Sequence, residues 1–145
     1  FLPASAIIKK LKPTWDAEFD GEKETYRKLA PLQGHVIPVF YDEGICDGVR
    51  ELLLSDLGDT SLHAERASCL SKLDLKRLIR PAVWAMLELG VEPADQNPRN
   101  YHLVGDGVFV LDFEDTAEVV DRARLRSLRR LWRMGLRTGR CLSPA

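Results

Sequence analysis

The chain of 145 residues has the length of one ordinary domain, and its 45% apolar and 30% charged residues are typical of a folded globular protein. No apolar run approaches the about 20 residues that a membrane-spanning helix needs. The three cysteines are far apart and form no C-x-x-C pair, which argues against a disulfide framework or a zinc ribbon and favours an intracellular, cytoplasmic location. The chain begins at Phe1 without a secretory signal, and we expect a fragment or a processed product.

The formal net charge of −1 hides an uneven distribution of charge along the chain. Residues 122–145 contain eight arginines and no acidic residue, whereas residues 1–121 contain all 22 acidic residues. The arginine-rich segment 122–140 suits an acidic external partner, but it equally suits the acidic remainder of its own chain. Because Trp132 is the only aromatic residue in this segment, stacking on bases is disfavoured, and we expect no nucleic-acid partner.

The part of the chain before residue 56 predicts a small sheet with one helix. Its expected elements are a strand at 6–11, a helix at 15–29, and a hairpin formed by 36–41 and 49–54 around the turn-forming segment 42–48. Pro13 ends the first strand, and either Thr14 or Asp16 is suited to cap the start of the helix.

A mainly helical part follows the segment 56–61, which contains Gly58. Its expected elements are a helix at 70–89, a hairpin formed by 103–104 and 108–111, and a helix at 117–136. Pro81 should kink or split the first of these helices, because proline has no N–H for the helical hydrogen bond. We therefore expect an α+β fold with two lobes, at 1–55 and 62–145, joined by a hinge at 56–61.

The most informative segment runs from Gly90 to Thr116 and gathers oxygen-bearing side chains. If its hairpin turn is centred on Asp106, Asn100 faces Asp112 across the strands, and Asp95 lies in the loop that approaches the same end. Carboxylate and amide oxygens are the ligands that Mg²⁺ and Mn²⁺ prefer. The spacing therefore predicts that these side chains converge on one divalent cation.

The pattern D-x-N-P-R-N at 95–100, followed by a short hairpin and D-F-E at 112–114, resembles the catalytic loop and metal-binding motif of the protein-kinase-like family. It is similar in particular to short kinase-like proteins common in fungi and to small-molecule kinases related to aminoglycoside and choline kinases. Three earlier stretches agree in order. The strand with the phosphate-binding lysine is similar to the stretch I-I-K-K-L-K-P. The helix with the glutamate partner of that lysine is similar to F-D-G-E-K-E-T-Y-R-K-L. The hinge that binds adenine is similar to L-L-L-S-D-L-G.

The resemblance covers about residues 6–116 and implies a truncated, two-lobed kinase-like fold with ATP and Mg²⁺ as cofactors. It implies that Lys9, rather than Lys10, contacts the α- and β-phosphates. It also implies that Glu22, rather than Glu24, pairs with this lysine. Asp95 would orient the attacking hydroxyl.

The remaining implied roles concern the metal and the nucleotide. Asn100 and Asp112 would hold the metal ion. The nucleotide would be bound by residues of the hinge and of the catalytic loop: Ser55, Asp56, Leu57 and Asn97. The pattern does not specify the phosphate acceptor.

Some features depart from the family pattern. Pro93-Ala94 replaces the His–Gly or His–Arg pair before Asp95, and Glu114 stands where protein kinases carry Gly. Few residues precede Lys9 or follow Glu114, so we expect neither the glycine-rich hairpin nor the usual substrate-binding helices in this chain. Two hypotheses follow: a phosphotransferase that acts on a hydroxyl of a small molecule or protein, or a pseudokinase remnant that is a binding module or has no function of its own.

Each candidate residue also has an ordinary structural interpretation. The alternatives are a solvated strand end for Lys9, pairing along the helix for Glu22, a turn for Asp95 and Asn100 beside Pro98, and a helix cap for Asp112, Glu114 and Asp115.

Overall fold

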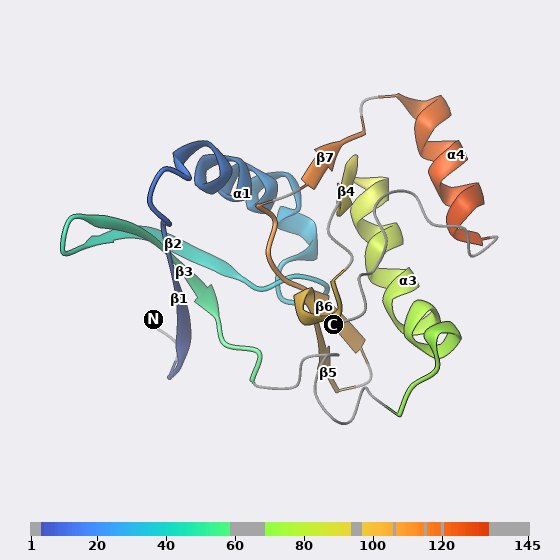
Figure 1. The fold of residues 1–145 in the computed structure, drawn as a ribbon, viewed down its shortest axis with the longest axis horizontal. Coiled ribbons are helices and arrows are strands. Elements are labelled where there is room, and N and C mark those ends of the chain that lie inside the picture. Colours follow the sequence, from blue (N-terminus) through green and yellow to red (C-terminus); the bar gives the residue numbers. More distant parts are fainter. Residues whose placement is uncertain are drawn as a thin grey trace.

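The computed structural model describes residues 4–58, 69–93, 97–105, 107–114, 116–119 and 121–133. In chain order its elements are β1 (Ala6–Lys10), α1 (Asp16–Lys28), β2 (Phe40–Cys46), β3 (Val49–Ser55), α3 (Lys72–Glu88), β4 (Val91–Pro93), β5 (Tyr101–Val104), β6 (Gly107–Val110), β7 (Thr116–Glu118) and α4 (Arg122–Arg133), with short 3₁₀ helices at Ala30–Leu32 and Pro98–Asn100. The described part is a mixed α+β structure, as the element pattern predicted. The three-stranded sheet and α1 lie at one end of the molecule and α3 and α4 at the other, with β5 and β6 between them (Figure 1).

The three-stranded sheet has the order β1-β3-β2, and each neighbouring pair is antiparallel. The expected hairpin is present, but its first strand begins at Phe40 and continues to Cys46, so most of the expected loop 42–48 is strand. The turn consists of Asp47 and Gly48, which have φ angles of 51° and 75°. Two-residue turns with positive φ match the twist of paired strands and favour this dipeptide. The polar residues at 42–44 concealed the strand from a search for apolar runs.

Helix α1 has one buried face. The buried residues recur every three or four positions: Phe19, Glu22, Thr25 and Tyr26. The N-cap residue is Trp15 and no side chain caps the helix, so the expected capping by Thr14 or Asp16 is wrong. Thr14 has a φ of 68°, and this turn directs the chain from the strand into the helix. Among these four buried residues of α1 only Glu22 is an acid, and it lies inside the domain.

Helix α3 is continuous through Pro81, so of the two expected effects, a kink or a split, the split does not occur. Ser71 caps its start, and the Ser71 hydroxyl accepts a hydrogen bond from the Asp74 N–H at 3.1 Å. The buried side of the helix contains Ile79, Ala82, Val83, Met86 and Leu87. Burial of this apolar face offsets the hydrogen bond that the exposed proline cannot donate.

The second hairpin, β5–β6, forms as expected but in a register that differs by one residue. Leu103 pairs with Val108 and Val104 with Gly107, which leaves two residues in the turn rather than three. Asn100 consequently lies opposite Leu111, whose N–H donates to the Asn100 carbonyl at 2.7 Å, and not opposite Asp112. Gly105 has a φ of 59°, and this conformation favours the shorter turn.

The last helix begins later than the expected residue 117. Thr116–Glu118 forms strand β7, antiparallel to β4, and α4 begins at Arg122. Because a strand follows the D-F-E segment, the interpretation of Asp112 and Glu114 as helix caps is wrong. Asp115 and residues 134–136 lie outside the described residues.

Helix α4 packs against the rest of the domain through its leucines. Leu128 is buried, and Leu125 is partly buried against the same core. Arg129 Nη2 lies 3.1 Å from Glu88 Oε1 on α3, so one arginine of the basic segment pairs with the chain's own acid. No helix of the described residues combines the length and the apolar character that a membrane span requires.

Candidate functional site

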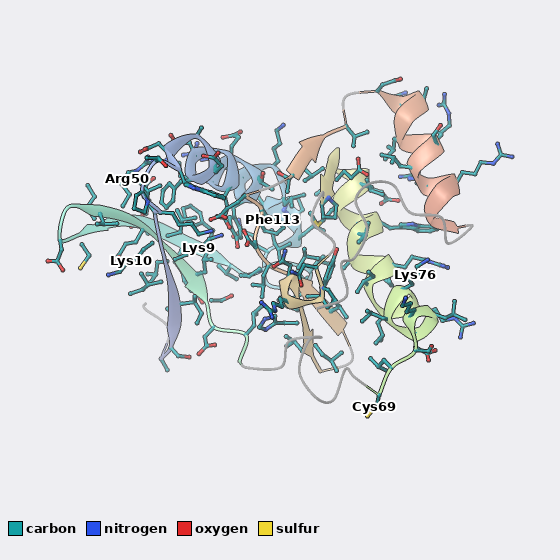
Figure 2. All side chains as sticks on the ribbon, in the orientation of Figure 1. Lys9, Lys10, Arg50, Cys69, Lys76 and Phe113 are labelled. Atoms are coloured by element: carbon teal, nitrogen blue, oxygen red, sulfur yellow. The ribbon has the colours of Figure 1, made fainter. Side chains whose placement is uncertain are left out.

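The candidate site is centred on the ammonium group of Lys9. Lys9 extends from β1 toward the middle of the molecule, whereas its neighbour Lys10 extends to the other side of the strand (Figure 2). Lys9 Nζ lies 2.8 Å from Glu22 Oε2, 2.9 Å from Asp112 Oδ1 and 3.2 Å from Glu114 Oε1. The Lys9 side chain is 22% exposed, so it is shielded from water but remains accessible from one side.

The expected ion pair between Lys9 and Glu22 is confirmed. Glu24, the rival glutamate, lies on the exposed side of α1, where its Oε2 is 3.3 Å from Arg27 Nη1. Glu22 rather than Glu24 pairs with Lys9 because Glu22 is three residues after Phe19 and lies on the same buried face of the helix.

Glu22 has an unusual environment for a carboxylate, because it is only 1% exposed. Burial raises the pKa of Glu22, and the ammonium of Lys9 opposes this effect. Burial alone would lower the pKa of Lys9, but the charges and hydrogen bonds of Glu22 and Asp112 outweigh it and raise that pKa. Lys9 therefore carries its positive charge at neutral pH, directly beside the buried acid.

The segment Asp112–Phe113–Glu114 follows β6 and is fixed by its central residue. Phe113 is 1% exposed and meets the Tyr26 ring edge-on at 5.1 Å, and Tyr26 stacks on Phe40 at 5.8 Å. The Phe113 N–H also donates to Glu22 Oε1 at 3.4 Å. This aromatic column, formed by Phe40, Tyr26 and Phe113, connects the segment to α1 and to the three-stranded sheet.

Asp112 and Glu114 flank the buried phenylalanine, and both carboxylates reach the Lys9 ammonium. Asp112 has a φ of 64°, a left-handed conformation that aspartate adopts more readily than most residues. The Glu114 N–H donates to Asp112 Oδ1 at 3.4 Å, which keeps the two acidic residues together.

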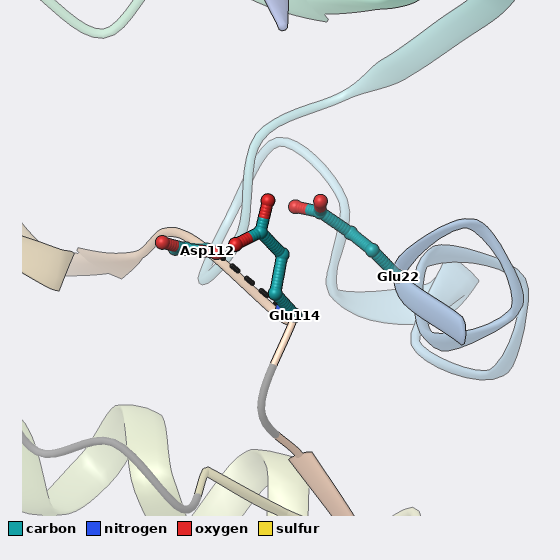
Figure 3. A group of neighbouring side chains, drawn as sticks. All are labelled: Glu22, Asp112 and Glu114. Carbon is teal, nitrogen blue, oxygen red and sulfur yellow. Dashed lines mark hydrogen bonds between the residues drawn. The ribbon is translucent and has the colours of Figure 1, made fainter. Parts of the chain in front are cut away.

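Three carboxylates meet at this point, from Glu22, Asp112 and Glu114. One oxygen of each lies within 4.8 Å of the others, and Figure 3 shows the Glu22 and Glu114 groups directed toward each other from α1 and from the D-F-E segment. Carboxylate oxygens are suitable ligands for Mg²⁺ or Mn²⁺. Sequence reasoning did not assign Glu114 to the site. The D-x-E spacing was the available signal, because two acids so close in the sequence can reach the same cation.

The expected cation ligands are only partly brought together. Asp112 reaches the site. Asn100 is held next to it through the backbone, because its carbonyl accepts a hydrogen bond from the N–H of Leu111, the residue before Asp112. Asp95 lies outside the described residues, so the convergence of all three side chains stays a prediction. Asn97 accepts a hydrogen bond from the Arg99 N–H at 3.0 Å and caps the short helix Pro98–Asn100.

A pocket of about 180 Å³ lies beside the charged site. Its lining is mainly apolar and includes the three expected hinge residues, Ser55, Asp56 and Leu57. The other lining residues are Ile7, Leu54, Gly58, His102 and Leu111. A cavity of about 150 Å³ is sufficient for a benzene ring, so the pocket has room for a flat heterocycle. The Ser55 hydroxyl accepts a hydrogen bond from the Val39 N–H at 2.9 Å, which fixes the end of β3 just before the expected hinge.

The pocket and the charged site share one side of β1. Ile7 lines the pocket, and Lys9, two residues later, reaches the carboxylates. Residues i and i+2 of a strand point to the same side and lie about 7 Å apart. Residues 59–61 of the expected hinge lie outside the described residues.

Comparison with models of known protein families and with curated proteins finds no match for this chain. The function is therefore inferred from the geometry of the site itself.

Proposed function

We propose that this chain is a protein-kinase-like domain that binds ATP with Mg²⁺ and transfers a phosphoryl group to a hydroxyl of a small molecule or a protein. The observation that carries the proposal is the position of Lys9 Nζ, 2.8 Å from Glu22 and 2.9 Å from Asp112. These residues belong to a strand, a helix and a post-hairpin segment in the order that the resemblance requires. Phosphoryl transfer depends mainly on positioning and on charge neutralisation, which such a set of groups supplies.

The pocket supports the same proposal. A nucleotide base in the pocket at 54–58 would place its phosphates along β1, because Ile7 and Lys9 lie on one side of the strand. Asp112 and Asn100 would hold Mg²⁺, which when bound neutralises negative charge on the phosphates. Asp95 would orient the hydroxyl of the acceptor. Lys9, held charged by Glu22, would fix the α- and β-phosphates.

A second candidate function is nucleotide binding without transfer, as in a pseudokinase, and Pro93 favours it. Pro93 stands where the family pattern has histidine, and it is buried in β4, where it pairs with Thr116 of β7. A proline side chain has no polar group, so it cannot support the neighbouring metal-binding segment by hydrogen bonds as a histidine can.

Calorimetry with Mg-ATP tests the proposal. We expect Lys9→Met and Asp112→Asn to weaken binding at least about tenfold. Lys9→Met removes the positive charge that would face the phosphates, and Asp112→Asn removes a negative charge that would hold the Mg²⁺. Asparagine tolerates the left-handed backbone at position 112, so that variant changes the charge and not the turn. Lys10→Met is the matched control, since Lys10 lies on the opposite side of the same strand. Equal affinity in all four proteins would contradict the proposal.

Two further measurements separate the candidate functions. Consumption of ATP with a panel of hydroxyl acceptors, lost in Asp112→Asn, would support the transferase. Binding without turnover favours the pseudokinase, and no heat at millimolar Mg-ATP contradicts both. Where Lys9→Met alone unfolds the domain, the double variant Lys9→Met/Glu22→Gln provides the comparison, because it removes the buried charge together with its partner.

A further inference from the structure

We propose that Lys12 is a second phosphate-binding cation, and that Glu114 occupies the position of a phosphate group between Lys9 and Lys12 while polyphosphate is absent. The inference rests on the proposed function, and it adds to that function a binding residue outside the family pattern. It also specifies the part of the ligand that is recognised, namely a chain of adjacent phosphoryl groups.

The geometry of Glu114 carries the inference. Glu114 Oε1 lies 3.2 Å from Lys9 Nζ, and Glu114 Oε2 lies 2.8 Å from Lys12 Nζ. One carboxylate therefore bridges two ammonium groups, with one oxygen for each. Phosphate oxygens accept from ammonium groups at the same distances as carboxylate oxygens do. Two cations separated by the width of a carboxylate are consequently suited to neighbouring phosphoryl groups.

Lys12 is held in position rather than extended freely into water. Its ammonium lies over the Trp15 ring, 4.5 Å from the ring centre. The backbone around it is fixed as well, since the Trp15 N–H donates to the Lys12 carbonyl at 3.1 Å and the Leu11 N–H to the Arg50 carbonyl at 2.9 Å. The Lys12 side chain is nevertheless 51% exposed, so a ligand from solvent can reach it.

The balance of charge gives Lys12 and Glu114 opposite effects on the binding of polyphosphate. Three carboxylates surround two ammonium groups in this cluster, which leaves one excess negative charge. A free polyphosphate is repelled by that excess and must also replace Glu114 at both lysines. Loss of the Glu114 charge should therefore strengthen the binding of polyphosphate, and loss of the Lys12 charge should weaken it.

A purely structural salt bridge would behave differently. A partly exposed pair such as Lys12–Glu114 contributes little to stability, and its loss in either variant is expected to be slightly destabilising. It provides no reason for ligand affinity to change in opposite directions.

Titration calorimetry with inorganic tripolyphosphate, in EDTA at low ionic strength, tests the inference. We expect Glu114→Gln to bind about tenfold more tightly than the unaltered chain, and Lys12→Met about tenfold more weakly. Lys10→Met, on the other side of β1, should bind like the unaltered chain. The double variant Lys12→Met/Glu114→Gln should gain less affinity for tripolyphosphate than Glu114→Gln does. Only Lys9 is then freed from its ion pair with Glu114, because Lys12 is no longer present.

The inference is overturned if Lys12→Met binds tripolyphosphate as well as Lys10→Met does, if Glu114→Gln shows no gain in affinity, or if neither the unaltered chain nor Glu114→Gln binds.

Failure of this inference can be distinguished from failure of the proposed function, because tripolyphosphate carries no base. Mg-ATP binding that needs Lys9 but not Lys12 would retain the function and reject the inference. Tripolyphosphate binding with the expected changes, in a chain that ignores Mg-ATP, would retain the inference and reject the function.

Discussion

Lys9 Nζ lies 2.9 Å from Asp112 Oδ1, although 103 residues separate the two along the chain. This contact joins β1 of the three-stranded sheet to the segment that follows β6, and so connects the parts of the chain on either side of the expected hinge at 56–61. Glu22, whose Oε2 lies 2.8 Å from Lys9 Nζ, is 1% exposed. The same three charges therefore determine both the stability of the fold and the candidate chemistry.

Removal of the Lys9 charge should destabilise the fold, because Glu22 would remain buried without its cation. We expect Lys9→Met to lower the free energy of unfolding by about 3 kcal/mol, near the lower end for broken buried ion pairs, since Lys9 is partly exposed. Urea denaturation at pH 7 measures this change. Lys9→Met/Glu22→Gln should recover most of the loss, because no unpaired charge is then buried. A double variant less stable than Lys9→Met would contradict this explanation.

Stability should also depend on pH through a surface network centred on Arg50. Arg50 lies 2.6 Å from Asp20 and 2.7 Å from Glu43, and these hydrogen bonds lower the pKa of both carboxyls below their ordinary values of 3.8 and 4.5. Because the folded state then binds fewer protons than the unfolded state, the stabilisation is complete above the ordinary pKa values and is lost as the pH falls below them.

The measurement is the Tm between pH 6 and pH 3 at low ionic strength, where surface pairs are least screened. We expect the Tm to fall less steeply with acid in Arg50→Gln than in the unaltered chain. Glu22, whose pKa is raised, contributes in the opposite direction, but it does so in both proteins and leaves the comparison intact. Parallel curves would show that the network adds nothing to stability.

The sequence predicted the features that depend on strong local patterns. The helical spacing of Phe19 and Tyr26 predicted the buried face of α1, on which Glu22 also lies, and Lys9 alternates with Lys10 on a short strand. Both patterns are fixed by backbone periodicity alone. The pairing of Lys9 with Glu22 was itself expected from the resemblance to the kinase-like family, and the two periodicities are consistent with the observed contact between these residues.

Features that depend on a choice between similar local conformations were not predictable. Gly105 and Gly107 permit both a two-residue and a three-residue turn. The shorter turn places Asn100 opposite Leu111 rather than opposite Asp112. The role of Glu114 depends on the strand that follows it. Acids ahead of an arginine- and leucine-rich helix also suit a helix start, so the local sequence favoured a cap over a site residue.

Most core substitutions lower the free energy of unfolding, but removal of the Tyr26 hydroxyl should not. Tyr26 is fully buried, and its hydroxyl has no hydrogen-bond partner among the described residues. Tyr26→Phe should therefore leave the free energy of unfolding unchanged or raise it by up to about 1 kcal/mol, because an unpaired buried polar group is removed. Tyr26→Ala should cost about 3–5 kcal/mol through the cavity it leaves in the aromatic column. A loss above about 1 kcal/mol in Tyr26→Phe would contradict the prediction.

The attachment of α4 can be tested by comparing two adjacent residues. Leu128 is 5% exposed and belongs to the core, whereas the pair Arg129–Glu88 lies at the surface. We expect Leu128→Ala to lower the free energy of unfolding by about 2–4 kcal/mol and Arg129→Ala by less than about 1 kcal/mol, as measured by urea denaturation. Equal losses that diminish in 0.5 M salt would instead show that arginines hold the helix on the acidic remainder of the chain. With the expected result the helix is held by its leucines, and the exposed Arg122, Arg126 and Arg130 are available for an acidic partner.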